Sequence, residues 1–333
     1  MTLSVAPSFA GGVHRPVMVD EACDALAPTD DKTFVDATFG SGGYSRALLE
    51  AALCHVWAID RDPDAVARGA ALSHAFPRRL CVMHGRFSEM VHLLAAHGIM
   101  AVDGVTFDLG VSSPQIDDPA RGFSFRQDGP LDMRMERQGP TAADFVNTAS
   151  ERELGDVIFF HGEEPRGRRI AEAIVRARRA APITRTLQLA DVVARAAPRR
   201  GGPRARIHPA TRTFQAIRIH VNGELGADGE LRRGLAAAER LLAPGGRLVV
   251  VSFHSLEDRE VKHFLNERSA VQPSANRFVP AAAPARAATF RLMFRGARQP
   301  TASEVQANAR ARSARLRAAV RTAAPSWAGV ASC

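Results

Sequence analysis

Short apolar runs alternate with helical patterns along the first part of the chain. Each run holds a few consecutive apolar residues and is followed by a stretch with apolar positions at helical spacing. Strands that alternate with helices form βαβ units, whose strands are parallel and covered on both faces. The sequence therefore predicts a wound parallel sheet, with strands at residues 34–36, 56–60, 80–83 and 102–109.

The strand pattern then stops, and a polar, loop-like stretch and several helical patterns take its place. It returns with a helix at 230–242, a buried strand at 247–253, and two short runs at 289–294 and 312–320 that we expect to be antiparallel edge strands. We therefore predict an α/β core interrupted by an inserted helical domain. The expected boundaries are 1–115 and 214–333 for the core and 116–213 for the insertion.

The composition argues against a membrane-spanning, secreted, disulfide-rich or metal-binding protein. The chain has 333 residues, of which 46% are hydrophobic, but no apolar run approaches the 18 residues of a membrane span. The first residues lack a basic start and an apolar stretch, so we expect no secretory signal and a cytoplasmic protein. The four cysteines show no C-x-x-C spacing, so no disulfide framework or zinc site is expected from Cys23, Cys54, Cys81 and Cys333. The histidines at 208, 220 and 254 also lack the spacing of metal ligands, so no metal site is expected.

The net charge of +9 is concentrated at the end of the chain. Residues 270–333 hold ten arginines against one acid, Glu304, whereas the rest of the chain is balanced. A basic segment on a neutral body favours a polyanionic partner, most simply RNA. The alternative is a bias of composition, because the chain has only two lysines and is rich in arginine and alanine, as in proteins from GC-rich genomes.

A glycine turn between the first predicted strand and its helix carries the candidate chemistry. The turn contains Gly40, Gly42 and Gly43, and Asp60 ends the next strand, where a carboxylate can accept ribose hydroxyl protons. The pyrophosphate pattern G-x-G-x-x-G lacks its third glycine, and the charge of Asp36 before the turn would repel a pyrophosphate. S-adenosylmethionine, with its cationic amino-acid end, suits Asp36 better than a dinucleotide; a tight turn without a ligand is the third possibility.

Four predicted strands should deliver side chains to one crevice, because ligands of wound sheets bind beyond the carboxyl ends of the strands. The residues at those ends are Asp36, Asp60, Phe87 and Asp108. Phe87 is placed to stack on an adenine ring, although a core phenylalanine fits the sequence equally well.

Several strings resemble one family, the bacterial ribosomal RNA small subunit methyltransferase H family, which uses S-adenosylmethionine to methylate the N4 amine of a cytosine. The resemblance runs from His14 to Arg317. The matching strings are DATFGSGGYS at 36–45, AIDRDP at 58–63, DLGVSSPQ at 108–115, RGFSF at 121–125, DGPLDMRM at 128–135, TRTFQAIR at 211–218 and SFHSLEDR at 252–259.

The resemblance implies a Rossmann-like class I methyltransferase sheet, mostly parallel with an antiparallel edge, and an inserted helical domain that recognises RNA. The implied substrate is a cytosine in the decoding region of 16S ribosomal RNA, within the small ribosomal subunit. Besides Asp36 and Gly40, the expected donor-binding residues are Gly42, Gly43, Tyr44, Asp60, Phe87, Asp108 and Gln115. Tyr44 departs from the histidine of many relatives, and Ala309 from a usual proline.

The reaction needs acceptors for the N–H bonds of a poorly nucleophilic amine, because these localise its lone pair. Asp108 and Ser113 occupy the corresponding place and are the catalytic candidates, although Asp108 can instead only hold the donor. His254 can face the base or be a structural histidine. Expected RNA contacts, needed to hold an unstacked base, are Phe123, Phe125, Arg134 and Arg218. A nucleotide-dependent oxidoreductase and a non-catalytic RNA-binding protein are the alternative functions.

Overall fold

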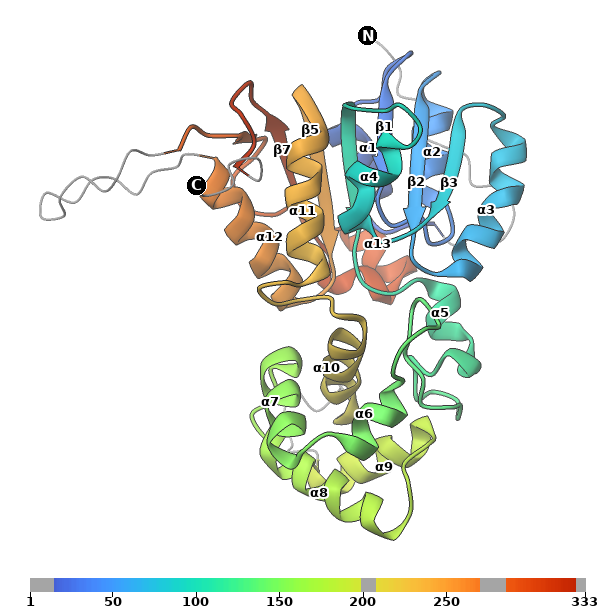
Figure 1. Cartoon of the computed structure of the whole chain (residues 1–333), viewed down its shortest axis with the longest axis vertical. Helices are drawn as coiled ribbons and strands as arrows, with labels where there is room; N and C mark the ends of the chain where they lie inside the picture. The colour runs from blue at the N-terminus through green and yellow to red at the C-terminus, as the bar shows by residue number, and fades with distance from the viewer. Residues whose placement is uncertain (1–14, 199–207, 270–285, 328–333) are drawn as a thin grey trace, which may run out of the picture. The chain divides into compact units, whose positions relative to one another are not determined.

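The computed structural model describes residues 15–198, 208–269 and 286–327. The chain forms two compact units, the first from Met1–Gly110 with Ala227–Cys333 and the second from Val111–Gly226 (Figure 1). The basic stretch at 199–206, most of the loop expected at 270–288, and Cys333 lie outside the described residues. Among the described helices, none is both long and apolar enough to span a bilayer.

The first unit is built on a mixed sheet, and its seven described strands run in the order β3-β2-β1-β4-β5-β7-β6. The pairs from β3 to β5 are parallel, whereas β7 is antiparallel to both β5 and β6. This confirms the predicted Rossmann-like class, including its antiparallel edge. The strands are β1 (Thr33–Asp36), β2 (His55–Asp60), β3 (Leu80–His84), β4 (Val102–Asp108), β5 (Leu242–Ser252), β6 (Phe290–Leu292) and β7 (Arg315–Arg321).

Helices cover both faces of this sheet. On one face, Gly69 of α3 packs directly on Val82 of β3, and on the other, Gly234 of α11 packs on the rings of Phe87 and Phe107. The first face also carries α1 and α2, and the second carries α4 and α12. The helices are α1 (Val19–Leu26), α2 (Gly43–Ala51), α3 (Pro63–Ala75), α4 (Met90–Ala95), α11 (Glu230–Leu241) and α12 (Ser255–Arg268), with α13 (Ala302–Ala307) between β6 and β7.

The order of the strands reverses at β1, which has β2 on one side and β4 on the other. Such a reversal opens a crevice at the carboxyl ends of the two central strands, because the connections leave in opposite directions. Asp36 and Asp108 end these two strands. The topology therefore brings both carboxylates to the place where a ligand of this fold binds.

The second unit is helical and has its own apolar core. Leu154 and Ile158 of α7 and Ile170 and Ile174 of α8 are fully buried in it. The polar stretch before α6 is irregular and is held by Arg121, whose guanidinium donates to the carbonyls of Arg134 and Met135 at 3.0 and 3.1 Å. The elements are α5 (Ser113–Asp117), η2 (Pro119–Arg121), α6 (Ala142–Thr148), α7 (Glu151–Gly162), α8 (Gly167–Ala180), α9 (Thr186–Ala196) and α10 (Ala210–Asn222).

Two parts of the fold differ from the sequence prediction. The stretch 208–222, expected only to lead back to the core, contains α10 (Ala210–Asn222), and Phe214 and Ile217 of this helix belong to the helical core. The compact units consequently divide after Gly110 and Gly226 rather than at the expected 115 and 213. Strand β5 begins at Leu242, before the glycines expected to precede it, and its ladder with β4 shifts register between Val102 and Gly104 to accommodate them.

Candidate functional site

The glycine turn after β1 is tied to the carboxylate that ends β2. The amide of Gly40 donates to Oδ2 of Asp60 at 2.7 Å, and the amide of Asp62 donates to Oδ1 at 2.8 Å. Burial raises the pKa of the Asp60 carboxyl, and these two amides oppose that rise. Each carboxylate oxygen keeps a second lone pair, so Asp60 can still accept protons from two neighbouring hydroxyls.

Asp36, the last residue of β1, is fully buried and binds the same turn from the strand that precedes it. Its Oδ2 accepts the backbone amide and the hydroxyl of Ser45 at 3.1 and 2.6 Å, and its Oδ1 accepts the amide of Thr38 at 3.3 Å. Burial raises the pKa of Asp36 to about 6, against the lowering effect of these hydrogen bonds. Asp36 therefore fixes the start of α2. Because its oxygens are bonded to Thr38 and Ser45, it would act on a bound ligand through the electrostatic effect of its charge.

The two glycines at the start of α2 leave no room for a side chain. Gly42 has a φ of 77°, and a Cβ there would lie 2.7 Å from a methyl carbon of Leu72. A Cβ on Gly43 would lie 2.0 Å from Cγ of Pro16. Positive φ and such close packing both require glycine. The backbone amides of this turn consequently have a fixed direction and no side chain of their own in front of them.

Tyr44 follows these glycines and is buried, with 3% of its surface exposed. Its hydroxyl donates to the carbonyl of Val17 at 2.5 Å. Burial raises the pKa of the phenol well above its usual value, and the negative charges of Asp108 and Asp36 raise it further. The tyrosine is thus neutral and lies close to the carboxylates of the site.

Asp108, at the end of β4, has a buried side-chain oxygen. Its amide donates to Oγ1 of Thr38 at 2.7 Å, but its side-chain Oδ1 is inaccessible to water and accepts no hydrogen bond from the described residues. Burial raises the pKa of this carboxyl well above its usual value, and the charges of Asp36 and Glu257 raise it further. A buried carboxylate oxygen is costly to leave unsatisfied, so this site is suited to a cation or an N–H donor from a ligand.

Glu257 is a member of this cluster that the sequence reasoning missed. It lies in the first turn of α12, and its Oε2 accepts the amide of Phe253 at 2.8 Å. Its Oε1 lies 3.0 Å from Nε2 of His254, whose Nδ1 accepts the Glu257 amide at 3.4 Å. Both ring nitrogens of His254 are engaged at the start of the helix, which supports the structural interpretation of this histidine. A glutamate three positions after a capping residue was the available signal.

Phe87 lies in the short 3-10 helix after β3 (η1, Phe87–Glu89). Its ring meets Phe107 edge to face, with centroids 5.3 Å apart, and lies against Gly234 of α11. The side chain is only partly buried. Its packing against β4 and α11 supports the core interpretation, while a stacking role toward a ligand stays a prediction.

Two further predicted residues lie in the second unit. Ser113 is the first residue of α5, and Gln115 is buried in the same helix, where its Oε1 accepts the amide of Ser112 at 3.0 Å. Gln115 thereby caps its own helix, and its expected contact with the donor stays a prediction, as does the catalytic role of Ser113.

The expected RNA contacts are engaged within the helical unit. Phe123 and Phe125 pack against its core, and the ring of Phe125 lies 4.7 Å from that of Phe214. Arg134 binds Asp132 through two nitrogens at 2.8 Å, and Arg218 binds Glu224 at 2.9 and 2.7 Å. These side chains have partners within the helical unit, and their expected RNA contacts stay predictions. Larger exposed aromatic surface lies elsewhere, at Phe159 and Phe160 on α7.

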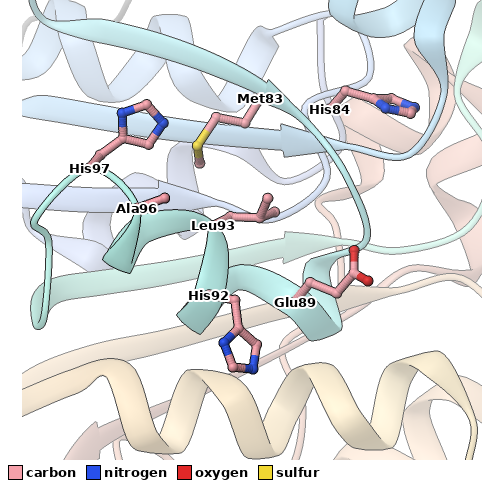
Figure 2. A pocket seen from close by; sticks show the side chains of 7 residues that line it. All are labelled: Met83, His84, Glu89, His92, Leu93, Ala96 and His97. Carbon is pink, nitrogen blue, oxygen red and sulfur yellow. The ribbon is translucent and has the colours of Figure 1, made fainter.

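An open hollow of about 720 Å³ lies beside the outer strand β3 (Figure 2). Figure 2 shows His84, His92 and His97 pointing in different directions, so their imidazoles do not converge on one point. None of the carboxylates of Asp36, Asp60, Asp108 and Glu257 lines this hollow. It is formed by Met83, His84, Glu89, His92, Leu93, Ala96 and His97. The candidate chemistry therefore lies outside this hollow.

The chain is similar to known proteins along most of its length. A sequence model of the MraW methylase family matches residues 12–322. A protein of Rhodospirillum centenum named ribosomal RNA small subunit methyltransferase H is 61% identical over 95% of this chain and 94% of its own. Proteins of the same name from Paramagnetospirillum magneticum and Sphingopyxis alaskensis are 56% and 57% identical, over 94% and 95% of this chain and 97% and 94% of theirs.

Proposed function

The chain belongs to the MraW methylase family, and from that premise we propose that it transfers a methyl group from S-adenosylmethionine to the N4 amine of a cytosine in 16S ribosomal RNA. The observation that carries the proposal is Oδ1 of Asp108, which is buried near the glycine turn and accepts no hydrogen bond from the part of the chain that the structure describes. With the family established, a nicotinamide-dependent oxidoreductase loses its support, because that alternative depended on the glycine turn alone.

The first unit offers a complementary set of groups for the donor. Asp60 would accept the ribose hydroxyls, and the backbone of Gly42, Gly43 and Tyr44 would bind the amino-acid end, where the charges of Asp36 and Asp108 favour an ammonium group. Phe87 is proposed for the adenine end, and the expected donor contact of Gln115, which belongs to the second unit, stays a prediction. S-adenosylmethionine supplies a methyl carbon activated by the sulfonium, and the protein's own task is to hold and orient the two reactants.

Asp108 is proposed as the acceptor for an N–H bond of the cytosine amine. A carboxylate oxygen that accepts this bond increases the electron density on nitrogen and stabilises the positive charge that develops as the methyl carbon approaches. A nearby cationic group would lower the raised pKa of Asp108 and keep the carboxylate ionised. Ser113 is the second candidate acceptor. The methylated nitrogen is acidic, so its proton can leave to water without a strong base.

The RNA partner is proposed from charge. Residues 270–333 contain ten arginines and only one acidic residue. In the helical unit, Arg168, Arg169 and Arg179 are exposed on α8. Arginines on both parts of the chain favour binding to phosphates. We propose that the helical unit holds the RNA, and that the small ribosomal subunit is the form in which the RNA is accepted.

A methyl-transfer assay tests this function. The protein is incubated with radiolabelled S-adenosylmethionine and either small subunits or naked 16S RNA, both from a strain that lacks the gene. We expect label in the subunits and little in naked RNA. Label in naked RNA alone would contradict the proposed form of the substrate, and no label in either sample would favour a non-catalytic RNA-binding protein.

A further inference from the structure

The residues just before α1 run across the glycine turn of the donor site. Residues 15–18, which we call the strap, lie in the first unit together with the turn and with α13. Val17 and Met18 are buried, with 6% and 1% of their surfaces exposed, while Arg15 is exposed and pairs with Asp20. The strap is therefore packed into the body of the unit.

Pro16 provides the first contact of the strap with the turn. Its ring carbons occupy the space that a side chain on Gly43 would need, at 2.0 and 2.9 Å from the position of such a Cβ. Gly43 has an ordinary φ, so its lack of a side chain is explained by the proline. The proline ring thus closes one side of the turn.

Tyr44 provides the second contact. Its hydroxyl donates to the carbonyl of Val17 at 2.5 Å, across 27 residues of sequence. The same phenol is close enough to Asp108 and Asp36 for their charges to raise its pKa. The tyrosine therefore joins the strap to the start of α2, directly after the two glycines of the turn.

Glu304 fastens the strap from the other end of the chain. Its Oε1 accepts the amide of Met18 at 2.7 Å, 286 residues away in sequence. Met18 has a φ of 53° and a ψ of 31°, the left-handed conformation that a non-glycine residue adopts only at a cost in free energy. Such a conformation persists where the surroundings determine it strongly, and it is common at functional sites.

We propose that residues 15–18 are a positioning strap for the methyl donor, fastened over the glycine turn by Tyr44 and Glu304. This inference rests on the proposed function. Glycine loses more conformational freedom than any other residue when it is ordered. A turn that is ordered before the donor arrives avoids that loss on binding, so the strap raises donor affinity. It touches neither reactant and acts through the backbone of Gly42 and Gly43.

Three substitutions in the full-length protein separate positioning from folding. Tyr44→Phe removes only the hydroxyl, Glu304→Ala removes the acceptor of the Met18 amide, and Glu304→Gln keeps an acceptor oxygen. A single lost hydrogen bond should raise the Kd for S-adenosylmethionine about fivefold in each of the first two variants. Glu304→Gln should restore affinity to within about twofold. Titration calorimetry without RNA measures these constants at a temperature well below unfolding.

The matched control is Glu50→Ala, because Glu50 pairs with Arg46 at 3.5 Å on α2, in the same unit, without touching the strap. This variant should bind the donor as the wild type does. In methyl transfer, the strap variants should raise KM for the donor but change kcat at saturating donor and KM for small subunits less than about twofold.

The inference fails if Tyr44→Phe and Glu304→Ala lower the melting temperature but bind the donor with wild-type affinity, because the strap then only stabilises the fold. It also fails if kcat falls while the donor KM stays constant. Absence of donor binding by the wild type would be a different result, since it would remove the proposed function itself.

Discussion

The amide of Gly40 and the carboxylate of Asp60 are joined by a hydrogen bond of 2.7 Å that links the turn after β1 to the end of β2. This bond sets the direction of the carboxylate relative to the glycine backbone, so the group proposed for the ribose is held against the turn proposed for the amino-acid end. The proposed donor site is consequently held by a contact within the protein itself.

Asp60→Asn should weaken donor binding. The amide keeps one acceptor oxygen but loses the charge, and hydrogen bonds to charged groups are worth about 1.5–3 kcal/mol, so we expect the Kd for S-adenosylmethionine to rise about tenfold or more. Titration calorimetry measures the change. The control is Asp103→Asn, since Asp103 accepts the amide of Thr33 at the opposite end of β1. Equal losses in both variants would show a general effect of destabilising the sheet.

Asp108→Asn should separate activity from stability. The substitution removes a carboxyl whose pKa is raised by burial and by neighbouring charges, so the free energy of unfolding at neutral pH should not fall. The rate of methyl transfer at saturating donor should drop about 100-fold or more, because the acceptor of the amine N–H is lost. Single-turnover kinetics and urea denaturation measure the two quantities. Unchanged turnover with normal donor affinity would remove Asp108 from the catalytic residues.

The raised pKa of Asp36 should make the free energy of unfolding depend on pH. Its pKa is about 6 in the folded protein against 3.8 ordinarily, so its contribution to stability is complete below pH 3.8 and is lost as the pH rises through 6. The difference of roughly two pKa units corresponds to about 3 kcal/mol. The unfolding free energy of the wild type, relative to Asp36→Asn, should therefore decrease by up to about that amount between pH 4 and pH 7. A difference that does not vary with pH would show that Asp36 is not perturbed.

Phe125→Ala should loosen the helical unit. The ring contacts Phe214 of α10 and lies 4.8 Å from the ring of His208, and removing a partly buried phenylalanine costs about 2 kcal/mol. Hydrogen exchange of the α10 amides measures the local opening free energy. Phe160→Ala, at a side chain that is 62% exposed, is the control and should change this energy by less than about 0.5 kcal/mol. Equal exchange in the two variants would mean that the Phe125 ring does not support α10.

Features that depend on neighbouring sequence were predictable. The proximity of Gly40 and Asp60 could be predicted because a strand, a glycine turn and a second strand follow one another closely. The parallel sheet could be predicted from the alternation of strands and helices. Helix α10 was readable too, since Ala210, Phe214 and Ile217 are spaced for one helical face. It was missed because the flanking prolines and basic residues resemble a loop.

Features that depend on distant contacts were not predictable. Oδ1 of Asp108 is buried and accepts no hydrogen bond from the described residues, and no local pattern in the sequence reveals such burial. The bond from Met18 to Glu304 joins residues 286 positions apart, and Glu304 had been noted only as the single acid of a basic tail. The start of β5 at Leu242 was not predicted, because proline and glycine, here Pro244 and Gly245, usually end regular structure. In the structure, the register shift against β4 accommodates these two residues within the strand.

Nucleoside analysis of the methylated product tests the central claim most directly. Small subunits from a strain that lacks the gene are incubated with the protein and methyl-labelled S-adenosylmethionine, and their 16S RNA is digested to nucleosides and separated by mass. The account predicts label in N4-methylcytidine alone, with none when Asp60→Ala/Asp108→Asn replaces the wild type. Label in another nucleoside, or equal label with the double variant, would contradict it.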